Sequence, residues 1–131
     1  MIILDSDFII DLFNGIEAAR EKIAAIPESN EELATTIFNA QEVLYGYAST
    51  GTAGQNYQHA AEFFMEIMVI GYQWEAMEKT MAIKKQLKGK GSPIGIFDEM
   101  IGGICLAHGA SILTRNVEHF AKIEGLKIVK Y

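Results

Sequence analysis

The sequence is poor in cysteine and proline, and both shortages limit what the protein can be. Its one cysteine, Cys105, cannot form a disulfide within the chain, which agrees with a reducing compartment. Its two prolines are Pro27 and Pro93, and no stretch has the composition of a linker between folding units. The 131 residues therefore predict a single domain, 1–131. Half of them are hydrophobic, which is enough for a core and excludes a disordered chain.

Long hydrophobic runs are also absent. The apolar start of the chain is short, lacks a basic leader and runs directly into Asp5, which is not the pattern of a signal peptide. Later apolar runs are interrupted by charge or glycine before they reach the length of a membrane span. The sequence therefore predicts a soluble, cytoplasmic protein that makes no membrane contact.

Basic residues are in the minority, with 11 Lys and Arg against 17 Asp and Glu and a net charge of −6. This balance disfavours a passive nucleic-acid-binding protein, because such proteins normally present a basic surface. It does not disfavour an enzyme that holds a metal ion, because the cation inverts the local charge before a phosphate arrives.

What the chain does contain is an alternation of strand and helix patterns. Short apolar runs predict strands at Ile2–Leu4, Leu33–Ile37, Met68–Tyr72, Ser111–Leu113 and Leu126–Val129. Apolar residues at helical spacing predict helices over Phe8–Phe13, Ile16–Ile26, Phe38–Ala48, Gln55–Ile67, Trp74–Leu87, Phe97–Ala107 and Val117–Ile123, with a break at Gly51–Gly54. This order predicts an α/β fold with a central, mostly parallel sheet of about five strands flanked by helices.

Carboxylates fall just after several of the predicted strands. Asp5 follows the first strand, Glu42 lies early in the helix after the second, and Asp98 opens the helix that leads into the fourth. Asn116 and Glu118 come just after the fourth strand. In an open parallel sheet, ligands bind outside the carboxyl ends of the strands, so these side chains are expected to converge at one edge.

Carboxylates that share a crevice repel each other, so they need a partner or a cation. Oxygen ligands without a cluster of cysteine or histidine favour Mg²⁺ or Mn²⁺ over zinc, and such an ion suits phosphodiester hydrolysis. Arg115 lies beside the predicted site and is a candidate for contacting phosphate. The alternative for each acid taken alone stays open: Asp98 can be a helix-start residue and Glu42 a solvated helix position.

At these residues the chain resembles the PIN-domain family, and it is similar in particular to VapC-type toxins. Three segments that together span the chain carry the resemblance: LDSDFIIDL, TTIFNAQEVLYG and SPIGIFDEMIGGICLAHGASILTRNVEHF. No single piece is specific, but all of them occur in the expected order and spacing. Two positions depart from the family pattern: Asp7 stands where Asn is common, and Asn116 stands where many members have a fourth acid.

The resemblance implies a PIN-like fold and a metal-dependent endoribonuclease that cleaves RNA. It implies Asp5, Glu42 and Asp98 as metal-binding catalytic carboxylates, with Ser6 and Thr114 as supporting hydroxyls. Asn116 and Glu118 remain alternative candidates to complete the site, and Asp7 adds negative charge there. A protein of this type would dimerise and would be held inactive by a small antitoxin protein.

Two other functions remain open at this stage. Asp5 and Asp7 after an apolar strand, with Ser111–Thr114, also fit a phosphatase of the haloacid dehalogenase type, with Asp5 as nucleophile. The remaining tail is too short for that enzyme's later motifs. A non-catalytic binding module on the same fold is the other alternative, and the missing fourth acid is its only support.

Histidine and aromatic residues give weaker indications. His119 lies near the predicted site, but we interpret it as a surface residue rather than a substrate contact. The aromatic residues after the second strand fit a core, a dimer interface or an antitoxin groove; they are Tyr45, Tyr47, Phe63 and Phe64.

Overall fold

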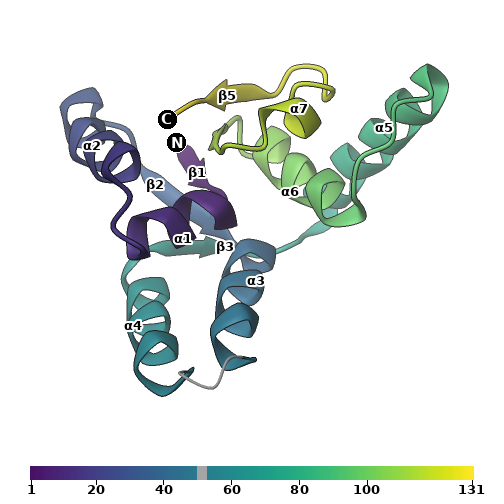
Figure 1. The fold of residues 1–131 in the computed structure, drawn as a ribbon. Coiled ribbons are helices and arrows are strands. Elements are labelled where there is room, and N and C mark those ends of the chain that lie inside the picture. Colours follow the sequence, from purple (N-terminus) through teal and green to yellow (C-terminus); the bar gives the residue numbers. More distant parts are fainter. Residues whose placement is uncertain (50–52) are drawn as a thin grey trace.

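A computed structural model describes residues 1–49 and 53–131 and has a five-stranded, all-parallel sheet at its centre (Figure 1). The strand order is β3-β2-β1-β4-β5, so β1 is the middle strand and the order reverses beside it. The strands are β1 (Ile2–Leu4), β2 (Leu33–Thr36), β3 (Met68–Ile70), β4 (Ser111–Leu113) and β5 (Lys127–Val129). The predicted α/β fold with a parallel sheet is therefore confirmed.

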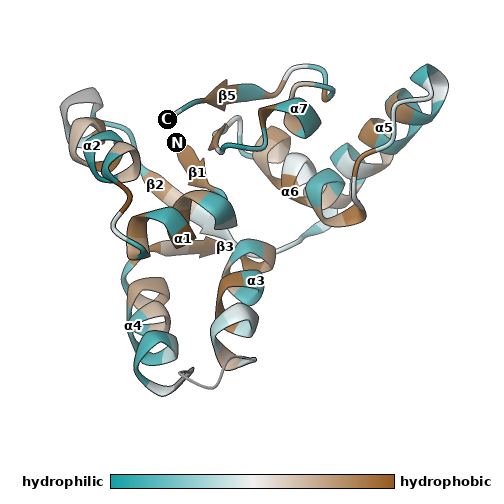
Figure 2. Cartoon of the chain, viewed as in Figure 1, coloured by the Kyte–Doolittle hydropathy of each residue, from teal (hydrophilic) through white to brown (hydrophobic). Residues whose placement is uncertain are grey.

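The central strands are apolar on both faces because helices cover both faces (Figure 2). Ile3 points into one hydrophobic cluster, while Ile2 and Leu4 point into the other, as the two-residue repeat of a strand requires. Leu4 lies opposite Thr35 of β2 on one side and Leu113 of β4 on the other. The residue that follows Leu4 therefore emerges at the middle of the sheet edge.

The first face is covered by the helices of the first half of the chain. Phe8, Ala19, Val43 and Ala60 come from four different helices and share one buried cluster with β1 and β4. These helices are α1 (Ser6–Phe13), α2 (Glu17–Ala25), α3 (Ile37–Ala48) and α4 (Ala53–Glu66), with a short 3-10 helix at Ile26–Ser29. In Figure 1, α3 and α4 lie side by side and project away from the sheet.

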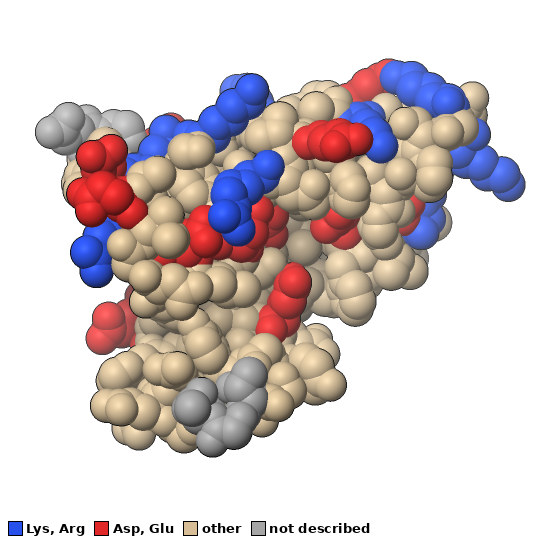
Figure 3. Space-filling view, viewed as in Figure 1, with Lys and Arg blue, Asp and Glu red and all other residues tan. Residues whose placement is uncertain are grey.

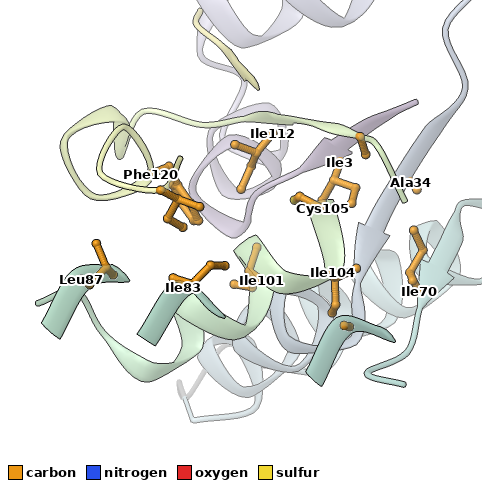
Figure 4. Packing of buried hydrophobic residues seen from close by; sticks show 13 residues of the cluster. Ile3, Ala34, Ile70, Ile83, Leu87, Ile101, Ile104, Cys105, Ile112 and Phe120 are labelled. Atoms are coloured by element: carbon orange, nitrogen blue, oxygen red, sulfur yellow. The ribbon is translucent and has the colours of Figure 1, made fainter. Parts of the chain in front are cut away.

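The second face is covered by α5 (Trp74–Lys90), α6 (Ile96–Ala107) and α7 (Val117–Phe120). Figure 4 shows Ile83 of α5 and Ile104 of α6 in the layer that faces Ile3 and Ile112 of the sheet. Cys105 is fully buried in this layer, as expected of a small hydrophobic residue, and burial raises the pKa of its thiol. No helix among the described residues is long and apolar enough to cross a membrane.

Most predicted elements shift by one or two residues at their ends, and side-chain caps explain two of the shifts. The first helix begins at Ser6 rather than Phe8, because the Asp5 carboxylate accepts from the Ser6 N–H and caps it. The second strand ends at Thr36, because the Thr36 hydroxyl accepts from the Asn39 N–H and starts α3.

Three other boundaries differ more clearly. The helix expected to end at Ile123 ends at Phe120, and the helix expected to end at Leu87 runs on to Lys90. Residues 51 and 52 of the break predicted at Gly51–Gly54 lie outside the described residues, whereas its last two residues belong to α4, so that part of the prediction is wrong.

The contact between α5 and α6 depends on glycine at position 103. A Cβ there would lie 2.6 Å from the Ala76 carbonyl oxygen, which belongs to backbone that cannot move aside. We expect Gly103→Ala to lower the free energy of unfolding by about 1–3 kcal/mol or more through overpacking, measured by urea denaturation.

Gly46→Ala in α3 is the matched control, because a Cβ there meets nothing within 4 Å. Alanine is the better helix former, so this variant should be as stable as the parent or more stable by about 0.5–1 kcal/mol. Equal stability of the two variants would contradict the proposed close approach of the helices.

Candidate active site

The Asp5 carboxylate lies buried at the carboxyl end of β1, where the strand order reverses. It is 6% exposed, and three groups from different parts of the chain donate to it. The Ser6 N–H donates to Oδ1 at 2.9 Å, Asn39 Nδ2 donates to Oδ1 at 2.7 Å, and the Thr114 hydroxyl donates to Oδ2 at 2.6 Å. The carboxylate thus joins the starts of α1 and α3 to the end of β4.

Glu42 is brought to the same edge by α3. The Ser6 hydroxyl donates to Glu42 Oε2 at 2.6 Å, so Ser6 bridges the two predicted metal-binding acids through its hydroxyl and its backbone. Glu42 itself is exposed to solvent. Ser6, which the resemblance implied as a supporting hydroxyl, therefore contacts both acids.

Asp98 stands in the first turn of α6, where the partial positive charge of the helix N-terminus stabilises a carboxylate. His119 Nδ1 lies 2.6 Å from Asp98 Oδ2, and Asn116 Nδ2 donates to the same oxygen at 3.4 Å. Asp98 Oδ2 accepts from Asn116, and a histidine tautomer with its hydrogen on Nδ1 would donate to the same oxygen. Of the two candidates after β4, Asn116 reaches this acid, whereas Glu118 is exposed on α7.

Asp7 is held between the two halves of the site. Its Oδ2 accepts from the Arg115 N–H at 2.9 Å and lies 3.3 Å from the Thr114 hydroxyl. Its Oδ1 is buried and has no hydrogen-bond partner among the described residues. A buried carboxylate oxygen without a donor is unfavourable, and it adds uncompensated negative charge to this edge.

Arg115 is partly committed within the protein. Its Nη1 forms an ion pair with Asp11 Oδ2 at 3.0 Å, and the Tyr131 hydroxyl donates to the same oxygen at 2.9 Å. The Arg115 side chain is nevertheless 59% exposed, and a guanidinium has five N–H donors. It can therefore contact a phosphate while it stays paired with Asp11.

Sequence reasoning missed two residues of this network. Asn39 is fully buried and bonds directly to Asp5, but a polar residue early in a helix gives no sign of such a role. We interpreted His119 as a surface residue, yet it is half-buried and paired with Asp98. The only available signal for His119 was its position shortly after Asn116.

The site is strongly acidic, and Figure 3 shows acidic side chains gathered over α1 with others over α3 and α6. The pKa of Asp5 is raised from 3.8 to about 7, mainly by burial. The charges of Asp7 and Asp98 act in the same direction, while hydrogen bonds from Thr114 and Ser6 act against the shift. Among the described ion pairs, none joins Lys or Arg to Asp5, Asp7 or Glu42.

These side chains do not form a closed metal cage. Among residues 1–49 and 53–131, no group of three or more Asp, Glu, His and Cys residues is placed to hold a metal ion as it stands. Mg²⁺ usually binds through one or two carboxylates and keeps several waters, so a complete protein cage is not required. The unpaired Asp7 Oδ1 and the uncompensated acids fit a hydrated hard cation.

Comparison with known proteins gives matches along the chain. A model of the PIN domain family matches residues 2–126. The tRNA(fMet)-specific endonuclease VapC of Shigella flexneri is 27% identical over 124 residues, which cover 92% of this chain and 94% of that protein. The protein of the same name from Salmonella typhimurium is 30% identical over 87 residues, 66% of each chain.

Among solved structures, VapBC2 from Rickettsia felis bound to a DNA fragment from their promoter contains a chain with the same fold. The TM-score is 0.89 at 21% identity, and the match covers 100% of this chain and 99% of that one. At this identity the likeness establishes the PIN fold, including the five-stranded parallel sheet.

The raised pKa of Asp5 predicts how the stability of the metal-free protein depends on pH. The folded state binds the Asp5 proton more tightly than the unfolded state does. Protonation of Asp5 therefore adds to the free energy of unfolding in full below pH 3.8, and this stabilisation is lost as the pH rises through about 7. The span from 3.8 to about 7 corresponds to on the order of 4 kcal/mol. In EDTA, we expect the free energy of unfolding to fall between pH 5 and pH 8.

Urea denaturation at pH 5, 6, 7 and 8 measures this effect, and Asp5→Asn should flatten the decline. Asparagine keeps the size of the side chain, and the Thr114 hydroxyl can turn to accept from its amide. If Asp5→Asn declines as steeply as the parent, another group is responsible.

Proposed function

The chain belongs to the PIN domain family, and on that premise we propose that it is an endoribonuclease that hydrolyses RNA phosphodiester bonds with the aid of Mg²⁺ or Mn²⁺. The observation that carries the proposal is the hydrogen-bonded chain Glu42–Ser6–Asp5–Thr114 at the edge of the sheet. It holds two acids from distant parts of the sequence in one place, beside Asp98. Membership of this family also removes the haloacid dehalogenase alternative for Asp5 and Asp7.

In this proposal, Asp5, Glu42 and Asp98 are the catalytic, metal-binding carboxylates. Asp7 adds a further negative charge beside them. A bound divalent cation would supply an acidified water and stabilise the negative charge that develops on the attacked phosphate. Asp5 would be ionised when the cation is present, because a nearby positive charge lowers the pKa of a carboxylate.

The remaining residues hold these acids in place. Asn39 and Thr114 orient Asp5, Ser6 orients Glu42, and His119 with Asn116 orients Asp98. Hydrogen bonds of this kind fix the direction of a ligand's lone pairs and support metal affinity. Arg115 would contact the RNA backbone next to the cleaved bond.

We further propose that the protein is the toxin of a toxin–antitoxin pair and acts on RNA in the cytoplasm. Its relatives named above are endonucleases of the VapC type, and the fold match is to a VapBC2 structure. By that analogy it would form a homodimer and bind a small antitoxin protein that blocks the acidic edge.

Cleavage of a mixed RNA pool by the purified chain tests the central proposal. We expect cleavage with Mg²⁺ or Mn²⁺, none with EDTA, and a loss of at least about a hundredfold in Asp98→Asn, since losing a metal ligand should cost more than losing its support. Glu124→Gln is the matched control, because it removes the same charge from an exposed ion pair with Lys90.

Cleavage that persists in EDTA or in Asp98→Asn would contradict the mechanism. A chain that binds RNA but never cleaves it would instead favour the non-catalytic binding module.

His119 offers a separate test of how Asp98 is held. We expect His119→Ala to weaken Mn²⁺ binding and reduce kcat by about 10–100-fold, the range for losing a group that supports a ligand. His119→Asn should restore most of both, because its amide can donate to Asp98 as Nδ1 does. Calorimetric titration with Mn²⁺ and steady-state cleavage measure the two quantities.

His59→Ala on α4 is the control and should behave as the parent, since His59 is exposed and lies outside the acidic edge. If His119→Ala binds Mn²⁺ as tightly as His59→Ala, the His119–Asp98 pair does not position the carboxylate.

A further inference from the structure

An apolar cleft opens directly beside the acidic edge, between α3 and α6. It has a volume of about 570 Å³, within the roughly 300–1,000 Å³ typical of small-ligand pockets. Phe38 and Tyr45 of α3 line one side, and Ile96 and Phe97 of α6 line the other. Glu42 and Asp98 belong to the same lining, so the cleft and the candidate active site form one continuous surface.

Large apolar side chains are left in solvent here. Tyr45 is 73% exposed and Phe97 is 57% exposed. Contiguous exposed apolar surface of this kind usually marks a binding site. The helix spacing explains the pattern on α3, where positions 38, 41, 42 and 45 share one face. That face carries both a predicted catalytic acid and an aromatic ring.

Contacts between aromatic rings support the lining of the cleft. The half-buried Phe38 ring contacts Tyr72 at a centroid distance of 5.5 Å and Phe97 at 5.6 Å. The exposed Phe97 ring is therefore in contact with a row of partly buried rings that packs against the core. A ring fixed before binding loses little freedom when a flat ligand stacks on it.

The charges around the cleft decide what kind of group fits inside. Its lining contains no Lys or Arg among the described residues, and its only charged members are Glu42 and Asp98. Figure 3 shows acidic side chains over α3 and α6 on both sides of the hollow. An anionic group is repelled from the interior, whereas a neutral, flat group is favoured. Gln41 adds an amide that can both donate and accept hydrogen bonds.

We infer that this cleft binds an unstacked nucleobase of single-stranded RNA, adjacent to the phosphate that lies at Asp5, Glu42 and Asp98. The inference rests on the proposed function and adds the part of the substrate that the acids do not contact. A base is neutral, flat and separated from its phosphate by only the sugar. Stacking on an aromatic ring suits any base and requires a strand that is not paired.

Binding of a short, fluorescein-labelled single-stranded RNA, measured by anisotropy in Mg²⁺, tests the inference. An Asp5→Asn background prevents cleavage during the measurement. We expect Phe97→Ala and Tyr45→Ala each to weaken binding by roughly tenfold or more, as for the loss of one stacking partner. Phe97→Tyr should retain most of the affinity, because it keeps the ring.

Trp74→Ala is the matched control, because Trp74 is an equally exposed aromatic residue, at 71%, on α5 outside the cleft. It should leave RNA affinity unchanged. A 2-aminopurine placed at successive positions of the RNA gives a second readout. One position should show quenched fluorescence on binding to the Asp5→Asn protein, and Phe97→Ala should abolish that quenching.

The outcomes separate this inference from the proposed nuclease. If the parent cleaves RNA but the Phe97 and Tyr45 variants bind it as tightly as Trp74→Ala does, the nucleobase cleft is wrong and the nuclease stands. If RNA binds through the cleft but the parent never cleaves it, the nuclease is wrong. If these variants change the oligomeric state on gel filtration and leave RNA affinity intact, the cleft is a protein contact and the inference fails.

Discussion

The burial of the Asp5 carboxylate at the end of the central strand is the constraint on which the site depends. A charge in this position loses its hydration and must be compensated by donors from the protein. Ser6, Asn39 and Thr114 supply those donors from three different segments. The bonds that replace water around Asp5 therefore also lock α1, α3 and the end of β4 into one arrangement.

These hydrogen bonds do not fully compensate for the lost hydration of Asp5, because its pKa remains raised. The charged groups near Asp5 include the acids Asp7 and Asp98, whose negative charges raise its pKa. An edge built this way is unfavourable in the empty protein and favourable around a cation. The same logic explains how a chain with a net charge of −6 can have a polyanion as its proposed substrate.

The acidic edge and the apolar cleft differ in chemistry, so the two proposals assign them different parts of a nucleotide. In the proposed function, the edge would hold a phosphate through a cation, and the aromatic side chains of the cleft would contact a neutral base. Tyr131 helps to position Arg115 at this edge through Asp11. Tyr131 packs edge-on against Phe8 at 4.7 Å and donates to Asp11, which in turn pairs with Arg115. Arg115 is thereby held near the acids without being buried.

The sequence by itself determined the α/β architecture, because alternating strand and helix patterns are local and repeat along the chain. It also predicted that Asp5, Glu42 and Asp98 share one edge of the sheet, because Asp5 and Glu42 follow predicted strands and Asp98 opens the helix that leads into another. It could not assign Asn39 or His119, because their roles depend on partners 34 and 21 residues away. Only the tertiary structure decided those pairs, together with the cleft between α3 and α6, because contacts between distant segments leave no periodic pattern in the sequence.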